Sequence, residues 1–332
     1  MSDIEMKKFP IFKNLTKEEY IQVCEYFKEI MTDYYYEEPL YFKWYDFYLG
    51  LDEIVDEYSK FLFNYRLFNA DINKENVNFN YCRIFESYIW HSLKIFSSIR
   101  YMLQKGCVET SIMSTRSLFE LTGVIWLLQT KYDLNIDMDE TYRIFACYSK
   151  LLNPKKKESG FTRFEWLKIA FKDLKSIDTK DFTINKIISL AKCPIENISD
   201  FYQMSSKYIH SDISVVPHYK DEAFKIFDLL DLNLSSQRIS GEINRIYNTM
   251  AGADNFIYEL LYIVWVLANS NALMYKKVNE NIDNKDIDKN LLKFGEKLLD
   301  AYKVFNKIND PNYDEKNFKK KYSKFKTLIK EK

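Results

Sequence analysis

Residues 81–129 constrain the fold more than any other part of the chain, because they contain two long runs with helical hydrophobic periodicity. In the first run, apolar side chains recur on one face at Ile84, Tyr88, Ile95 and Ile99. The second run is apolar on nearly every side between residues 112 and 127, which is typical of a helix at the centre of a protein. Gly106 lies between the runs and predicts a helix end and a short hinge. The segment therefore predicts a long antiparallel helix hairpin.

The scarcity of helix breakers extends this prediction to the whole chain. Its 332 residues include only 7 Gly and 6 Pro, whereas 26 Tyr and 25 Phe raise the aromatic share to 17%. Few breakers and many long side chains favour long helices over sheets and hairpins. A hydrophobic share of 47% with 29% charged residues is typical of a soluble globular protein. We predict an all-α fold, a helical bundle around the long hairpin.

The pattern along the chain predicts three segments: an N-terminal helical extension (1–80), a core helical bundle (81–275) and a C-terminal charged helical tail (276–332). Residues 34–48 are crowded with aromatic side chains and include Pro39, which predicts a connection with short helical pieces. The lysines of the tail are typical of a solvated face; alternatively, the apolar stripe among them could bind an acidic surface, RNA or a partner helix. This stripe consists of Phe318, Tyr322, Phe325 and Leu328.

The most membrane-like run covers residues 256–275. Glu259 near one end and Asn269, Ser270 and Asn271 near the other leave too short an apolar span for a bilayer, so we predict a buried core helix and no membrane partner. The first residues, MSDIEMKKFPIF, lack the apolar region of a secretory signal. The five cysteines are isolated in the sequence, which favours reduced core thiols and a cytoplasmic location.

Charge and motif content exclude several function classes. Lys plus Arg (48) equals Asp plus Glu (48), so nucleic acid could be attracted only by a local patch. Three scattered histidines and the isolated cysteines offer no metal-ligand spacing, and His91 beside Trp90 is predicted to be structural. The sequence lacks the glycine-rich, Walker-type, HExxH and GxSxG motifs of common nucleotide-binding proteins and hydrolases. We expect neither a metal nor a cofactor.

Two polar groups stand out within the apolar second run. Arg116 and Glu120 are four residues apart, so both side chains lie on one helical face and can pair. An unpaired charge would be costly in such an apolar helix. The pair is therefore either a buried ion pair that holds the helix in register or part of a functional site that includes polar groups from elsewhere.

A second polar stripe follows far downstream, in the segment FYQMSSKYIHSD. Tyr202, Ser206 and His210 recur every four residues on one face of a predicted helix. Two hydroxyls and an imidazole in this arrangement could bind a phosphate, or His210 could act as a general acid or base. Alternatively, His210 bridges helices with its ring nitrogens satisfied. We interpret the two segments as meeting in one polar cluster.

These residues carry a family resemblance. The helix containing RSLFE at residues 116–120 and the later helix YQMSSKYIH at 202–210 resemble a group of bacterial helical proteins of unknown function, whose hallmarks are Arg-Ser-Leu-x-Glu and Tyr-x-x-x-Ser-x-x-x-His. The resemblance spans residues 81–217. Such bundles are in turn similar to the HEPN superfamily (higher eukaryote and prokaryote nucleotide-binding), many members of which are metal-independent ribonucleases of toxin–antitoxin and phage-defence systems.

The HEPN hallmark is an arginine followed shortly by a histidine in one helix, usually at a dimer interface. This sequence departs from it, because Gln203, Met204 and Ser205 occupy the positions where the arginine before His210 would stand. Under this resemblance, either Arg116 supplies the cation from another helix or the nuclease activity is absent.

The resemblance implies a HEPN-like RNA-cleaving or RNA-binding effector in bacterial anti-phage or toxin-type defence. His210 would be the general acid or base and Arg116 would stabilise the developing negative charge. Tyr202, Ser206 and Glu120 would position the substrate. The expected partners are RNA and a second copy of the chain or another protein. The alternative is a non-catalytic helical interaction or regulatory module whose Arg/Glu/His cluster is structural.

Overall fold

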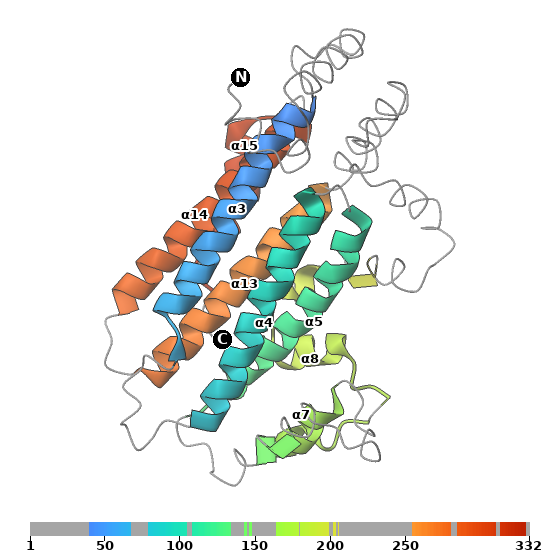
Figure 1. The fold of residues 1–332 in the computed structure, drawn as a ribbon. Coiled ribbons are helices and arrows are strands. Elements are labelled where there is room, and N and C mark those ends of the chain that lie inside the picture. Colours follow the sequence, from blue (N-terminus) through green and yellow to red (C-terminus); the bar gives the residue numbers. More distant parts are fainter. Residues whose placement is uncertain are drawn as a thin grey trace, which may run out of the picture.

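The protein is a bundle of helices. The computed structural model describes residues 40–67, 79–104, 108–133, 143–144, 146–147, 164–178, 180–198, 202–203, 205, 254–279, 284–309 and 313–329. Within these ranges all regular secondary structure is helical, which confirms the predicted all-α fold (Figure 1). The long helices are α3 (Leu40–Asn64), α4 (Phe79–Gln104), α5 (Val108–Lys131), α13 (Asp254–Val278) and α14 (Asn284–Asn309).

Shorter helical elements decorate this frame. The segment after α5 contains α7 (Glu165–Ala170), η3 (Lys172–Leu174), α8 (Ile184–Leu190) and η4 (Pro194–Ile198), and the chain ends with α15 (Glu315–Lys321) and η5 (Ser323–Lys326). Of these, α8 packs on α5, η4 packs on α13, and η5 packs on α14.

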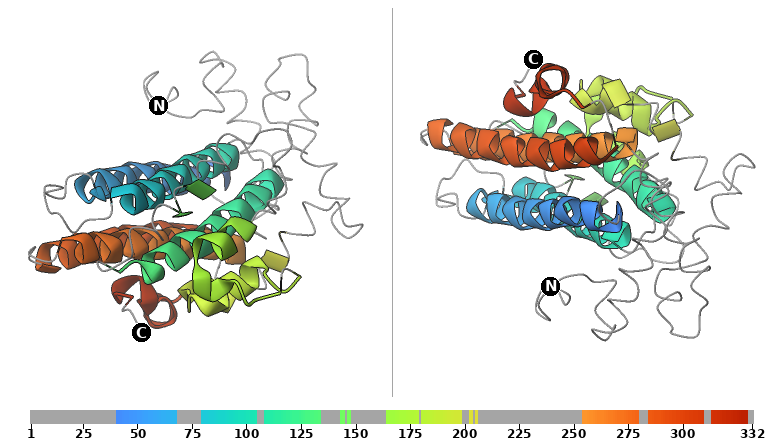
Figure 2. Two further views of the ribbon diagram at one scale, coloured as in Figure 1. Left: turned by 90° about the horizontal axis from the view of Figure 1, so that it is seen from below. Right: turned by 90° about the horizontal axis from the view of Figure 1, so that it is seen from above.

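The long helices close a ring. Each packs against the next in the order α3, α4, α5, α13 and α14, and α14 returns to α3. In the views from below and from above, where the long helices lie lengthwise, α3 and α4 are on one side and α13 and α14 on the other, while α5 crosses obliquely (Figure 2). The directions of α3, α4 and α5 alternate, so α4 and α5 form the predicted antiparallel hairpin (Figure 1). Its predicted hinge residue, Gly106, lies outside the described residues.

Helix α13 is the most buried element of the ring. Every side chain from residue 260 to residue 268 is at most 5% exposed, because α13 contacts α3 and α4 as well as α5 and α14. By length and composition, Phe256–Val278 could cross a membrane, yet 83% of its apolar window is buried inside the bundle. The helix is therefore buried in the core, as its sequence predicts.

Helix α3 begins earlier than the sequence predicts. The predicted connection over residues 34–48 is wrong from Leu40 onward, where a helix runs without interruption to Asn64, and residues 34–39 lie outside the described part. A proline is tolerated just before or at the start of a helix, so Pro39 does not prevent α3 from beginning at the next residue. The two aromatic residues of this stretch whose side chains are described, Phe47 and Tyr48, are buried, and the ring of Phe47 lies 4.9 Å from that of Phe305 on α14.

All three segments predicted from the sequence contribute to one hydrophobic core within the described residues. For example, Phe61 on α3 stacks on Phe294 on α14 with ring centroids 6.1 Å apart, and Tyr58 on α3 packs edge-on against Phe96 on α4 at 6.5 Å. Helix α3 therefore connects α14 to the central hairpin.

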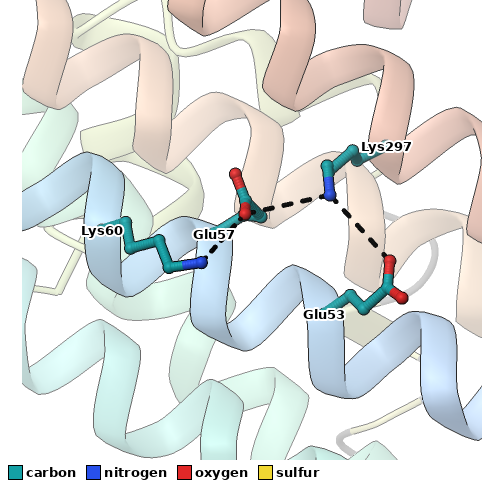
Figure 3. Close-up of polar contacts among 4 residues, drawn as sticks. All are labelled: Glu53, Glu57, Lys60 and Lys297. Atoms are coloured by element: carbon teal, nitrogen blue, oxygen red, sulfur yellow. Dashed lines mark hydrogen bonds and ion pairs between the residues drawn. The ribbon is translucent and has the colours of Figure 1, made fainter.

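Ion pairs line the exposed edge between α3 and α14. The Nζ of Lys297 lies 3.8 Å from Glu57 Oε1 and 3.9 Å from Glu53 Oε2, and Lys60 Nζ lies 3.2 Å from Glu57 Oε1 (Figure 3). Exposed pairs of this kind contribute about 1 kcal/mol or less each. The aromatic contacts beneath them therefore dominate the α3–α14 interface.

The apolar stripe of the C-terminal tail is not an external binding surface. Its Phe318, Tyr322 and Phe325 are buried, and Leu328 packs against the same core. The ring of Tyr322 lies 4.8 Å from that of Tyr302 and 5.0 Å from that of Tyr258. The predicted role in binding an acidic surface, RNA or a partner helix is corrected accordingly, because the protein's own helices α13 and α14 cover the stripe.

Asn269 ties the chain terminus to α13. Its side chain is 1% exposed, its Nδ2 donates to the carbonyl of Trp265 (2.7 Å), and its Oδ1 accepts from the backbone N–H of Ile329 (3.1 Å). We expect Asn269→Ala to lower the free energy of unfolding by about 1–3 kcal/mol, because it leaves the N–H of Ile329 without its acceptor. Urea denaturation measures the change.

A matched control is Asn279→Ala near the end of the same helix. Asn279 is also buried, but its Nδ2 donates a local hydrogen bond, to the carbonyl of Tyr275 one turn earlier (3.0 Å). Its replacement should have the smaller effect. Equal losses in the two variants would show that the bond to Ile329 does not hold the terminus.

Candidate functional site

Helix α5 positions the two charged residues singled out in the sequence. Arg116 and Glu120 lie one turn apart, with Arg116 Nε 3.4 Å from Glu120 Oε1. Their side chains are 14% and 3% exposed, so both charges are largely removed from water. The two opposite charges stabilise each other at this depth, because either charge buried without its partner would carry a high desolvation cost.

Tyr202 reaches this pair from a distant part of the chain. The phenol hydroxyl accepts a hydrogen bond from Arg116 Nη2 (3.0 Å) and donates one to Glu120 Oε1 (3.0 Å). The guanidinium carbon of Arg116 lies 4.8 Å from the centre of the tyrosine ring, and Phe119 stacks on the same ring with centroids 5.2 Å apart. We call Arg116, Glu120 and Tyr202 the Arg116 cluster.

The close packing of α8 on α5 holds the chain segment before Tyr202 near the Arg116 cluster. At Gly123 on α5, an added Cβ would lie 2.9 Å from Ile188 of α8, so the two helices pack closely only because this residue has no side chain. The indole of Trp126 donates to the carbonyl of Ala191 at the end of α8 (3.1 Å). Tyr202 comes four residues after the end of η4 in the sequence, and its hydroxyl contacts Glu120, about one turn before Gly123 on α5.

The structure thus brings together three of the five predicted site residues, and the interpretation that the two segments meet agrees with this geometry. Ser206 and His210 lie outside the described residues, so their roles stay predictions. Burial, followed by the neighbouring charge of Glu120, raises the pKa of the Tyr202 phenol despite the opposing effect of Arg116. The phenol is therefore protonated at neutral pH and acts as a donor to Glu120.

Glu120 also lines an open pocket of about 560 Å³ between α4 and α5. Apolar side chains form one wall, including Trp166, whose ring lies parallel to that of Tyr88 with centroids 6.1 Å apart. The polar groups of the lining are Glu120, His91, Lys94, Ser98, Ser114 and Ser117. The Arg116 cluster is therefore buried on one side and borders an open pocket on the other.

A second groove of about 780 Å³ lies between the end of α3 and the first half of α4. It shares His91 and Lys94 with the pocket, so the two hollows adjoin along the outer face of α4. Its lining also includes Arg66, Arg83, Glu86, Trp90 and Phe63. This surface is rich in cations and aromatic rings although the whole chain is neutral.

His91 is exposed on this face and lines both hollows, while its predicted structural role stays a prediction. The sequence contains a signal that could have located it. Polar residues recur every three or four positions along α4 and are exposed in the structure: Arg83, Ser87, His91, Lys94 and Ser98. This periodicity predicts a continuous polar stripe.

Metal-binding groups do not gather in the described part of the chain. No cluster of three or more His, Cys, Asp or Glu side chains suited to a metal occurs there. Cys82 is buried, and burial raises the pKa of its thiol to about 12, which makes it a poor nucleophile. The buried Cys82, Cys147 and Cys193 form no disulfide within these ranges, and the remaining two cysteines lie outside them.

Comparison with known proteins leaves the family open, since no family model matches the chain and searches of curated proteins and of solved structures gave no match. Fold and site define an all-α bundle with a buried Arg–Glu–Tyr cluster beside a basic surface. The HEPN-like resemblance stays a hypothesis that rests on the quoted motifs.

Proposed function

We propose that the protein is a HEPN-like RNA-binding effector of bacterial defence that binds single-stranded RNA along the outer face of α4 and, in its catalytic form, cleaves it without metal. One observation carries the proposal. Glu120 of the Arg116 cluster borders an open pocket that shares Lys94 and His91 with a basic groove, so a strand in the groove would lead to the cluster.

The chemistry of the groove supports RNA as the ligand. Arg66, Arg83 and Lys94 concentrate positive charge on one surface of a chain with no net charge. Contacts between such side chains and phosphates supply most of the sequence-independent affinity for nucleic acids. The rings of Trp90 and Phe63 in the same lining offer flat faces on which unpaired bases can stack.

In the catalytic form, Arg116 supplies the cation that the HEPN hallmark would place before His210. A phosphate oxygen competes with the Tyr202 hydroxyl and the Glu120 carboxylate for the guanidinium. His210 acts as the general acid or base, and Ser206 helps to position the substrate. A partner, either a second copy of the chain or another protein, completes the assembly in this proposal.

We expect purified protein in EDTA to bind a labelled single-stranded RNA with an affinity that falls steeply as salt rises. Lys94→Ala should weaken binding and reduce the slope of log affinity against log salt by about 1, because one phosphate contact is lost. The control is Lys60→Ala, which removes the same charge from a lysine that pairs with Glu57 (Figure 3) and lines neither hollow.

Cleavage is tested in the same buffer with total cellular RNA, using His210→Ala beside the wild type. Loss of cleavage in a folded His210→Ala variant supports the catalytic form. RNA binding without cleavage would support the RNA-binding function and contradict the catalytic form. An absence of RNA binding, or equal losses with Lys94→Ala and Lys60→Ala, contradicts the proposal.

The second candidate function is a non-catalytic interaction or regulatory module. It is favoured by the contacts within the Arg116 cluster, in which the guanidinium pairs with Glu120 and donates to Tyr202. In that case the cluster fastens the Tyr202 segment to α5 and exposes no reactive group. The thermodynamic test of this role is the first one argued in the Discussion.

A further inference from the structure

Glu86 is a buried carboxylate in the lining of the basic groove. Glu86 lies on α4 and is only 6% exposed, yet it borders the open groove of about 780 Å³. The side chain of Trp90 forms a hydrogen bond with this carboxylate. Its Oε2 is buried and has no hydrogen-bond partner among the described residues. Burial raises the pKa of Glu86, while Trp90 and the charge of Arg66 lower it.

A buried acceptor without a partner costs free energy that a ligand can recover by donating to it. The surroundings restrict which ligand that is. Arg66, Arg83 and Lys94 line the same groove and repel a cationic peptide, so they favour an anionic group. The rings of Phe63 and Trp90 favour a flat group, and Phe63 is 54% exposed with the guanidinium of Arg66 stacked on it at 4.4 Å.

The ligand that combines these properties has a negative charge, a flat ring and an N–H donor on the ring edge. We propose that this groove is a subsite for one nucleotide unit whose base carries an exocyclic amino group, with Glu86 accepting from that amino group. The phosphate contacts Arg66 or Arg83, and the base stacks on Trp90 or Phe63. The inference rests on the proposed RNA function only in that RNA supplies the nucleotide.

Glu86 gives the subsite a preference among bases. A carboxylate accepts from the N4 amino group of cytosine. Uracil has the same ring and nearly the same stacking area but presents the carbonyl O4 at that position, which repels a carboxylate. Cytosine and uracil therefore form a matched pair that isolates the contribution of Glu86 from charge and stacking.

The experiment compares fluorescently labelled hexamers of cytidine and of uridine on the full chain, by equilibrium anisotropy at fixed salt. We expect the wild type to bind the cytidine hexamer about tenfold more tightly, in line with the discrimination typical of a single base contact. Glu86→Gln keeps the shape but adds an amide donor that uracil O4 accepts, so the preference should fall to about twofold or less. Glu57→Gln, on α3 outside the groove, should leave it unchanged.

The outcomes separate this inference from the proposed function. If both hexamers bind equally well to the wild type, or Glu86→Gln keeps the preference, the subsite is wrong and RNA binding stands. If neither hexamer binds but cytidine monophosphate binds and needs Glu86, the subsite stands and the RNA function is wrong. If hexamers and cytidine monophosphate all fail to bind, both are wrong. Far-UV circular dichroism of Glu86→Gln checks that the variant is folded.

Discussion

Replacing Arg116 by leucine is expected to lower the free energy of unfolding by about 3 kcal/mol or more, because it leaves the Glu120 carboxylate buried without its cation. Glu120 is 3% exposed, so water cannot take over the lost interaction, and the Tyr202 hydroxyl loses its donor. Urea denaturation at neutral pH, followed by far-UV circular dichroism, measures the change.

The double variant Arg116→Leu with Glu120→Leu provides the control. Removing both charges abolishes the uncompensated carboxylate, and apolar replacements of buried ion pairs are often close to neutral. We therefore expect the double variant to regain much of the stability lost in Arg116→Leu, a coupling that a double-mutant cycle detects. Lys297→Ala, which breaks exposed pairs with Glu53 and Glu57, should change stability by about 1 kcal/mol or less.

This cycle also decides how function is assigned to the Arg116 cluster. If Arg116→Leu is as stable as the wild type, the pair contributes nothing to the fold, and a structural role is contradicted. If it is strongly destabilised, a loss of RNA cleavage in that variant says little about chemistry. His210→Ala and Lys94→Ala then become the informative variants, since Lys94 is exposed on the surface of α4.

The long helices were predictable because their hydrophobic periodicity continues over many turns. The hairpin of α4 and α5 and the buried α13 follow directly from this pattern. The start of α3 and the burial of the tail stripe could not be predicted from this pattern, for one physical reason. Aromatic side chains such as Phe47 and Phe325 carry no local sign of whether they face solvent, a partner or their own core, and only the packing of α14 and α13 decides it.

In the candidate site, too, some features could be predicted from the sequence and others could not. The pairing of Arg116 with Glu120 follows from four-residue spacing on a helix, and the apolar surroundings indicate that the charges are buried. The position of Glu86 is different, because its burial depends on the end of α3 lying against α4, and residues 66 and 86 are not connected by any local pattern. The basic groove therefore could not be predicted from the sequence.

Gly295→Ala is expected to destabilise the protein by about 1–3 kcal/mol through overpacking, with the upper end favoured by the geometry. A Cβ added at Gly295 on α14 would lie 2.0 Å from the carbonyl oxygen of Phe325 and 2.9 Å from the ring of Trp265. The carbonyl belongs to the backbone of η5, so it cannot turn aside as a flexible side chain would. Relief requires η5 to move away from α14, which exposes the buried Phe325 ring.

Gly50→Ala on α3 is the matched control, because the same methyl is added to a helix with room to accept it. Its Cβ would lie 3.4 Å from the Cβ of Ala301, an ordinary contact. Since alanine is favoured over glycine inside a helix by about 1 kcal/mol, Gly50→Ala should be neutral or stabilising. The same propensity gain is available at Gly295, so the difference between the two variants in urea denaturation isolates the steric cost of the carbonyl contact. Equal stabilities would mean that η5 does not rest on α14 at Gly295, and the near-UV circular dichroism of the protein, to which Trp265 contributes, would then be unchanged by the substitution.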